Sequence, residues 1–139
     1  AWVLGTGAEY RVLDQLPANV GLVLPLNFPE APKVEDAEAA LDLNLADLEH
    51  WQLAPHNPNR IAAAGREFAL TLARLDKPED AFWPALRKAV KYGLSEEAAL
   101  AALTTTPARW LGQQQRLGSL ESGRIANFVI ADDTLLRDE

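Results

Sequence analysis

The stretch Val20–Leu26, with the sequence VGLVLPL, is almost wholly apolar and has the length of a β-strand. Such strands are typical of parallel sheets, in which both faces of a central strand are buried. On the amino-terminal side, Ala1–Leu4 predicts a second short strand, followed by a turn at Gly5–Gly7 and a helix over Ala8–Leu16. On the carboxy-terminal side, alternating apolar residues predict a third strand over Glu67–Leu72.

The segments between and after these strands carry helix signals. Apolar residues at helical spacing, with cap residues or proline before them and glycine after several of them, predict helices over 45–53, 58–64, 78–92, 95–103 and 106–112. The expected N-caps are Asn57, Asp76 and Ser95. Strands that alternate with helices in this way indicate an α/β fold with parallel strands. Only about three strand–helix units are present, which is too few to close an eight-stranded barrel.

Composition narrows the classes of function. The 139 residues are 48% hydrophobic and 24% charged, as expected for a globular domain with one core. The net charge of −7 repels phosphate backbones and anionic lipid, so we expect neither a nucleic-acid nor a membrane partner. The absence of Cys excludes disulfides and thiol chemistry but leaves the compartment open. Because the chain begins at Ala1 and contains no Met, we expect a processed chain or part of a longer protein.

Several short motifs have both a functional and a structural interpretation. Gly5–Gly7 resembles the start of a dinucleotide-binding turn, but Tyr10 stands where the third glycine belongs, so a plain tight turn is favoured. Thr104–Thr106 adjoin no histidine, and we expect them to end one helix and begin the next. The acidic run Glu30–Asp42 predicts a solvated loop, with a lid as the alternative. We expect core or helix-to-sheet packing for the three helical tryptophans, Trp51, Trp83 and Trp110.

His50 and His56 are the only histidines, and they are weak candidates for metal ligands. With Asp47 or Glu49 they would supply part of a metal site. However, a six-residue spacing that crosses Pro55 does not place both imidazoles on one helix face. A surface or capping role is therefore favoured for both side chains, and we assign no catalytic or cofactor-binding residue to this chain.

The last third of the chain carries an extended motif. Its parts are GLSEEA at Gly93–Ala98, ALTTTPARWLG at Ala102–Gly112 and LGSLESGRIANFVI at Leu117–Ile130. In this order they resemble the carboxy-terminal signature of the amidohydrolase superfamily, which includes imidazolonepropionase-like and dihydroorotase-like enzymes. Earlier segments, 25–29 and 51–58, fit more loosely a subgroup of large, often exported bacterial members.

The resemblance implies the carboxy-terminal portion of a (β/α)8 amidohydrolase barrel together with return strands of a β-sandwich. Residues 1–112 would form late β/α units of the barrel, and residues 113–139 would form strands of the sandwich. Family members use a divalent metal, most often zinc, to hydrolyse amide or cyclic amide C–N bonds in small molecules. The resemblance thus implies a metal-dependent hydrolase as the parent protein.

The sequence departs from the family pattern where catalysis needs it. The chain has no H-x-H pair, and the acidic residue that ends the last barrel strand would fall near Ala73, with Asp76 too far along. We therefore expect the isolated chain to be inactive and to hold no metal. The parent protein then either uses an altered metal site or is a degenerate, non-catalytic binding or scaffold module with the same fold. A self-contained small α/β domain is a third possibility.

The tail predicts a hairpin over Leu117–Ile125 and a strand over Ala126–Ala131. A strand that exposes Phe128, Val129 and Ile130 without a partner strand predicts self-association through its edge.

Overall fold

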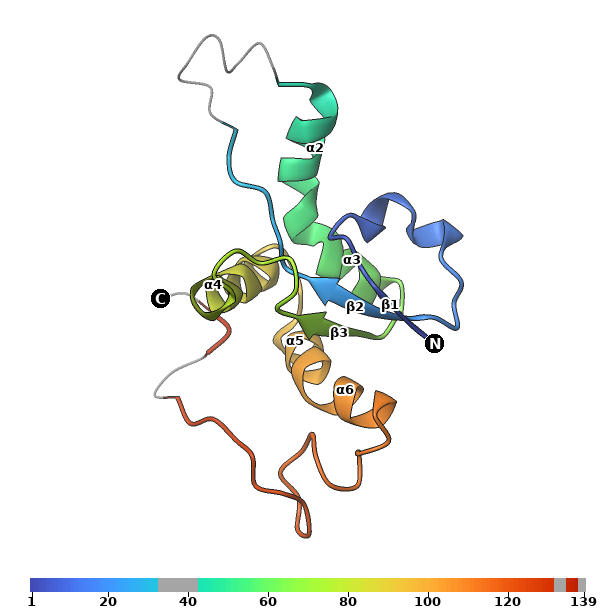
Figure 1. Cartoon of the computed structure of the whole chain (residues 1–139), viewed down its shortest axis with the longest axis vertical. Helices are drawn as coiled ribbons and strands as arrows, with labels where there is room; N and C mark the ends of the chain where they lie inside the picture. The colour runs from blue at the N-terminus through green and yellow to red at the C-terminus, as the bar shows by residue number, and fades with distance from the viewer. Residues whose placement is uncertain (33–42, 132–134, 138–139) are drawn as a thin grey trace.

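A three-stranded parallel sheet forms the centre of the chain (Figure 1). The computed structural model describes residues 1–32, 43–131 and 135–137. The strands β1 (Trp2–Leu4), β2 (Gly21–Pro25) and β3 (Phe68–Thr71) lie in the order β1-β2-β3, with Val3 opposite Leu22 and Val23 opposite Ala69. The three predicted strands and their parallel direction are confirmed, so the chain has the expected α/β organisation.

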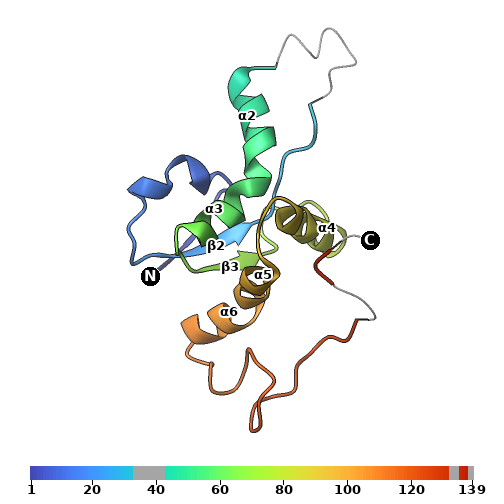
Figure 2. The ribbon, with the colours of Figure 1, turned by 180° about the vertical axis from the view of Figure 1, so that it is seen from behind.

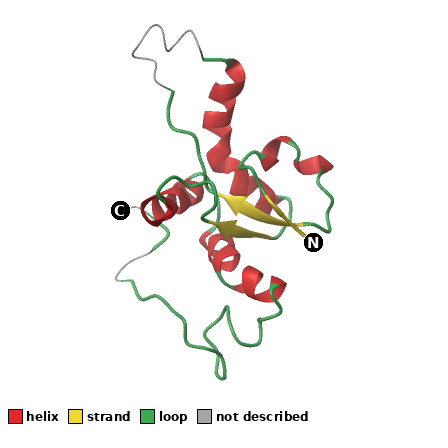
Figure 3. Cartoon of the chain, in the orientation of Figure 1, coloured by secondary structure: helices red, strands yellow, loops and turns green. Residues whose placement is uncertain are grey.

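The predicted helices after the second strand are also present (Figure 3). They are α2 (Leu45–Leu53), α3 (Asn57–Ala63), α4 (Pro78–Lys91), α5 (Glu96–Leu103) and α6 (Thr105–Trp110), with a 3-10 turn η3 (Ala54–His56) between α2 and α3. In the views from front and back, α2 and α3 lie toward the top of the picture, nearer β2, and α5 and α6 lie toward the bottom, nearer β3 (Figures 1 and 2).

The core lies between one face of the sheet and the helices. Leu22 and Leu24 of β2 are fully buried, as are Ile61 of α3 and Leu86 of α4. The alternation of buried Leu22 and Leu24 with half-buried Val23 follows from the two-residue period of a strand. Burial of each such side chain contributes about 1.5–3 kcal/mol to the free energy of unfolding.

The prediction of one continuous helix over Ala8–Leu16 is wrong. Two 3-10 turns, η1 (Glu9–Arg11) and η2 (Leu13–Gln15), replace it, and Val12 between them has φ −130° and ψ 16°. The Glu9 side chain folds back onto the turn that precedes it, and Glu9 is buried. A continuous helix would have required helical dihedral angles at Val12.

Two of the three predicted N-caps are also wrong. Ser95 caps α5 as expected, because its Oγ accepts a hydrogen bond from Ala98 N at 3.1 Å. The cap of α3 is His56 rather than Asn57, whose side chain instead enters a buried polar cluster. The cap of α4 is Lys77 rather than Asp76, with a left-handed backbone (φ 47°) and no side-chain hydrogen bond.

No strand is present over residues 113–131, so the prediction of a hairpin over Leu117–Ile125 and a strand over Ala126–Ala131 is wrong for this chain. One feature of the hairpin survives, since Ile125 N donates to Arg116 O at 2.9 Å and closes a loop. A strand needs a neighbour for its backbone groups, and within the described residues this segment has none. After the tail, Leu136 returns to the core, and Arg137 forms an ion pair with Glu96.

The tryptophans divide between the core and the surface. Trp83 packs against the core cluster, and Trp110 stacks on Trp2 with ring centres 5.9 Å apart. Trp51 is 39% exposed on α2, a helix with no buried residue, so the prediction that it packs in the core is wrong. The acidic run begins at Glu30, which is exposed, but residues 33–42 lie outside the described part of the chain. None of the described helices is long and apolar enough to span a membrane.

Candidate functional site

The carboxyl ends of β1, β2 and β3 meet at one edge of the sheet because the strands are parallel. We call this the carboxyl edge and define it as Gly5–Gly7, Leu26–Asn27 and Leu72–Ala73, the residues that follow the three strands. In α/β folds, ligands bind beyond the carboxyl ends of the strands. The carboxyl edge is therefore the place to look for functional groups.

The best-organised polar group at this edge is the Glu9 carboxylate. It accepts hydrogen bonds from the backbone N–H and the hydroxyl of Thr6, from Gly7 N at 3.2 Å and from Asn57 Nδ2 at 2.8 Å. The Gly5–Gly7 turn thus holds a carboxylate of its own chain with successive N–H groups, an arrangement that favours anions. This is the tight turn that the sequence favoured over a dinucleotide site.

Glu9 is charged at neutral pH despite its burial, with 6% of its surface exposed. Burial raises the pKa of the Glu9 carboxyl, but the hydrogen bonds from Thr6 and Asn57 outweigh it and hold the pKa below its ordinary value. A buried carboxylate whose lone pairs are occupied in this way is positioned rather than free to take up a proton.

Two asparagines extend this polar cluster. Asn57 Oδ1 accepts a hydrogen bond from Tyr10 N at 2.8 Å, so one amide joins α3 to both Glu9 and the start of η1. Asn27 Nδ2 donates to Thr6 O at 3.1 Å, whereas the buried Asn27 Oδ1 has no hydrogen-bond partner within the described residues. Gly7 has φ +94°, and a Cβ there would lie 2.5 Å from Asn27 Oδ1, which explains the glycine.

The structure does not bring His50 and His56 together as a metal site. His50 Nδ1 lies 3.0 Å from the Tyr10 hydroxyl, while His56 Nδ1 lies 3.1 Å from Tyr92 O and its ring packs edge-on against the Tyr92 ring. Over residues 1–32, 43–131 and 135–137, no three His, Asp or Glu side chains gather closely enough to hold a metal ion. The described residues therefore do not fit the metal that the family resemblance implies.

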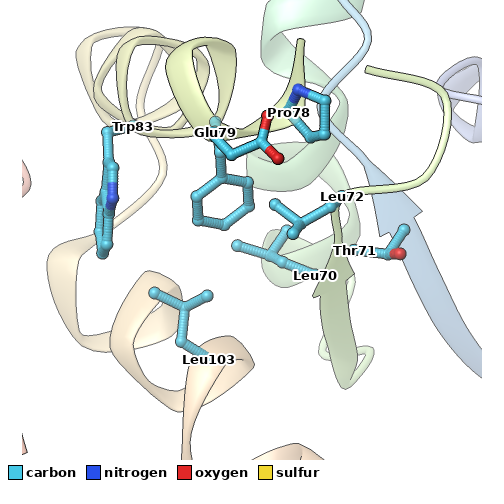
Figure 4. Close-up of a pocket in the computed structure, with 8 residues that line it drawn as sticks. Leu70, Thr71, Leu72, Pro78, Glu79, Trp83 and Leu103 are labelled. Atoms are coloured by element: carbon cyan, nitrogen blue, oxygen red, sulfur yellow. The ribbon is translucent and has the colours of Figure 1, made fainter. Parts of the chain in front are cut away.

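The three residues that follow β3 are Leu72, Ala73 and Arg74, and none of them is acidic. Thr71 Oγ1 accepts a hydrogen bond from Ala73 N at 3.1 Å, which closes the turn locally. An open hollow of about 400 Å³ lies between β3 and α4 (Figure 4). It is largely apolar, with Leu70, Trp83 and Leu103 in its lining, and Glu79 is the one ionisable residue there.

Comparison with known proteins identifies the family. The family model described as "Amidohydrolase family" matches residues 61–138, more than half of the chain. The chain belongs to the amidohydrolase family. The match includes β3, the helices α4 to α6 and the tail, and so contains the motif that carried the resemblance.

Curated relatives match over short segments. The chain is 55% identical over 38 residues to an imidazolonepropionase from Erwinia tasmaniensis, which is 27% of this chain and 9% of that protein. It is 49% identical over 45 residues to amidohydrolase tasK from Hapsidospora irregularis, 32% of this chain and 5% of that protein. It is also 49% identical over 43 residues to an N-acetylglucosamine-6-phosphate deacetylase from Mus musculus, 31% of this chain and 10% of that protein. The chain thus aligns with a tenth or less of each relative.

A solved structure extends the likeness of fold to most of the chain. An amidohydrolase from Thermotoga maritima matches 90% of this chain and 29% of its own, with a TM-score of 0.63 and 24% sequence identity. The arrangement of strands and helices is therefore shared with an amidohydrolase well beyond the carboxy-terminal motif.

Sequence analysis missed Glu9, Asn57 and Tyr10 as a connected group. The signal for Glu9 was present, since an acidic residue two positions after a Gly-x-Gly turn can accept hydrogen bonds from that turn. The bond to Asn57 spans 48 residues and depends on the packing of α3 beside η1, so local sequence held no signal for it.

Proposed function

We propose that this amidohydrolase-family chain supplies late β/α units of a (β/α)8 barrel, residues 1–112, within a longer protein. Residues 113–139, which form no strand over 113–131 in the isolated chain, become final strands of a β-sandwich when that protein supplies their strand partners. That protein hydrolyses a C–N bond in a small amide or cyclic amide. It requires a divalent metal ion, zinc in our proposal, held by other parts of the protein. The isolated chain is inactive.

The family match over residues 61–138 carries this proposal. The two outer strands of the sheet support the barrel, since β1 and β3 each have a free edge and Trp2, Val3 and Leu4 are about half exposed. A further strand beside β1 would cover these three residues, and another would pair with the outer edge of β3. The names of the relatives support a hydrolase that acts on a small molecule, although each name describes only that relative.

A non-catalytic scaffold or binding module is the second candidate. Ala73 favours it, because the family resemblance implies an acidic residue near this position and alanine can neither bind a metal nor take up a proton. Glu9 also favours it, because its carboxylate is committed to hydrogen bonds within the chain.

We further propose that the isolated chain self-associates with a second copy through residues 126–131. Phe128, Val129 and Ile130 are 58%, 76% and 81% exposed. An extended apolar segment without a strand partner forms backbone hydrogen bonds with another chain.

Zinc binding and hydrolysis test the proposed function. The purified chain is incubated with Zn²⁺, freed of excess metal, and assayed for bound zinc and for hydrolysis of acyclic and cyclic amides. We expect zinc far below one ion per chain and no turnover, with any residual zinc removed in a His50→Gln/His56→Gln variant. One zinc per wild-type chain, or any amide turnover by it, would contradict the proposal, and loss of that zinc in the variant would assign it to the two histidines.

The natural protein that contains this chain separates the two candidates. Bound metal together with amide hydrolysis supports the hydrolase. A metal-free protein without hydrolysis would replace it with the scaffold.

A further inference from the structure

A concentration of positive charge surrounds Tyr10 in a chain whose net charge is −7. The guanidinium carbons of Arg11 and Arg60 lie 5.7 Å and 5.6 Å from the centre of the Tyr10 ring. His50 stacks on the same ring with ring centres 6.1 Å apart. These groups come from η1, α2 and α3, three elements that the fold brings together beside the carboxyl edge.

Guanidinium N–H groups near Tyr10 remain without a hydrogen-bond acceptor in the described part of the chain. Arg11 Nε donates to the Tyr10 hydroxyl at 3.2 Å, and Arg11 Nη2 donates to Ala46 O at 3.2 Å. The hydroxyl hydrogen is then available to His50 Nδ1, 3.0 Å away, and in that arrangement His50 Nε2 carries the ring proton. Within the described residues, neither Arg11 Nη1 nor the Arg60 guanidinium makes a hydrogen bond or an ion pair. The Arg60 guanidinium lies over the Tyr10 ring.

Neither arginine is neutralised by a carboxylate in the described part of the chain. The ion pairs found there involve Arg109, Arg124 and Arg137. Because both guanidinium carbons lie near one ring centre, they are no more than about 11 Å apart, close to the screening length of about 10 Å at 0.1 M salt. Three acidic side chains lie on the same elements, and none forms an ion pair with Arg11 or Arg60 among the described residues. Glu9 accepts hydrogen bonds from its own turn, Asp47 accepts one from Asn44, and Glu49 is exposed on α2.

We propose that Arg11, Arg60 and His50 form an oxyanion-binding site on the Tyr10 ring, which takes the carboxylate or phosphate group of a small molecule. An oxyanion would accept hydrogen bonds from the free guanidinium N–H groups and relieve the repulsion between the two cations. Tyr10 positions the site, because its backbone N–H donates to Asn57 Oδ1 and both guanidinium groups lie near its ring.

Titration with simple anions tests this site. The 139-residue chain, labelled with ¹⁵N, is titrated with inorganic phosphate and separately with acetate at low ionic strength, and amide and His50 ring shifts are followed. We expect saturable shifts centred on Tyr10, Arg11 and His50 that weaken as salt is added. Tighter binding of phosphate supports a phosphate ester as the ligand, and equal or tighter binding of acetate supports a carboxylate.

Charge-matched variants make the test specific. Arg60→Gln removes a cation whose one described contact is the Tyr10 ring, so we expect a folded chain that binds the anion about tenfold more weakly. Arg60→Lys should retain part of the affinity. Lys91→Gln removes an equal charge from the exposed end of α4 and should change affinity less than twofold. Absence of saturable shifts in the wild-type chain, or equal losses in Arg60→Gln and Lys91→Gln, would overturn the proposal.

Discussion

At the scale of single residues, the Glu9 carboxylate is the polar group on which the amino-terminal turn depends. Glu9→Gln places an amide N–H₂ among donors of the turn and removes the charge that those bonds stabilise. We expect the variant to lose about 1.5–3 kcal/mol of unfolding free energy at neutral pH. Urea denaturation of both chains measures the loss, and Glu49→Gln, at an exposed carboxylate of α2, should change little.

The pH dependence of stability follows from the lowered pKa of Glu9. Because the folded-state pKa lies below the ordinary value of 4.5, the unfolded chain binds the proton more tightly. The stabilisation by Glu9 is therefore fully present above about pH 4.5 and is lost as the pH falls through the lower folded-state pKa. Denaturation at a series of acidic pH values should give a shallower decline for Glu9→Gln, and parallel declines would contradict this assignment.

Arg66 is the second residue with a defined structural role. Its guanidinium donates to the carbonyl oxygens of Leu16, Pro17 and Val20 at 2.8, 2.7 and 3.0 Å, and so fixes the loop between η2 and β2. We expect Arg66→Gln to lower the unfolding free energy by about 2 kcal/mol. Lys91→Gln is the control for charge, and a loss no larger than that of the control would show that the three bonds are unimportant.

These residues also show where sequence analysis stops. The Gly5–Gly7 turn was predicted because it depends on adjacent residues, but Asn57 was misplaced as a helix cap. Its amide bonds to Glu9 and Tyr10, and contacts across nearly fifty residues leave no local pattern. His50 is a weak metal candidate by sequence, but its ring stacks on Tyr10, and sequence spacing does not predict that contact. The same Tyr10 ring lies near Arg11 and Arg60.

At the scale of elements, α5 depends on its amino-terminal cap. Ser95 has an extended backbone, and its Oγ accepts from Ala98 N, while Glu96 and Glu97 occupy the first turn. We expect Ser95→Ala to cost about 1 kcal/mol of unfolding free energy and Ser95→Asp to cost less, since Asp preserves the bond and suits the helix dipole. Thermal denaturation of the wild-type chain and the two variants measures these differences. Equal stability of Ser95→Ala and the wild type would contradict a stabilising role for the Ser95 cap.

The elements that were predicted correctly are those whose signals are local. Periodic apolar residues and terminal glycines placed α3 to α6, and Gly93 ends α4 with φ +105° as expected for a carboxy-terminal cap. The segment over Ala8–Leu16 forms two 3-10 turns in place of a helix, because the backbone of Val12 lies outside the helical region and interrupts it. The tail over residues 113–131 has the apolar residues typical of a strand but forms none. A strand requires a neighbouring strand to pair with, and composition does not show whether one is present.

At the scale of the whole molecule, the exposed apolar tail predicts concentration-dependent association. Light scattering over a range of concentrations should show a mass that rises above 15.2 kDa for the wild-type chain. Val129→Lys/Ile130→Lys should reduce the effect, because charged side chains block edge pairing, whereas Leu120→Lys, at an exposed residue outside the segment, should not. A wild-type chain that remains monomeric throughout would contradict association through this segment.

We propose above that this chain is part of a longer amidohydrolase-family protein whose metal ligands lie outside the chain. The most direct test is the mass of the natural gene product, measured by immunoblot of source-cell extract with antibody raised against the 139-residue chain. We expect a band several times 15.2 kDa, in line with a solved structure of which the chain matches 29%. A single band near 15.2 kDa would contradict it and would leave the family membership as a description of fold alone.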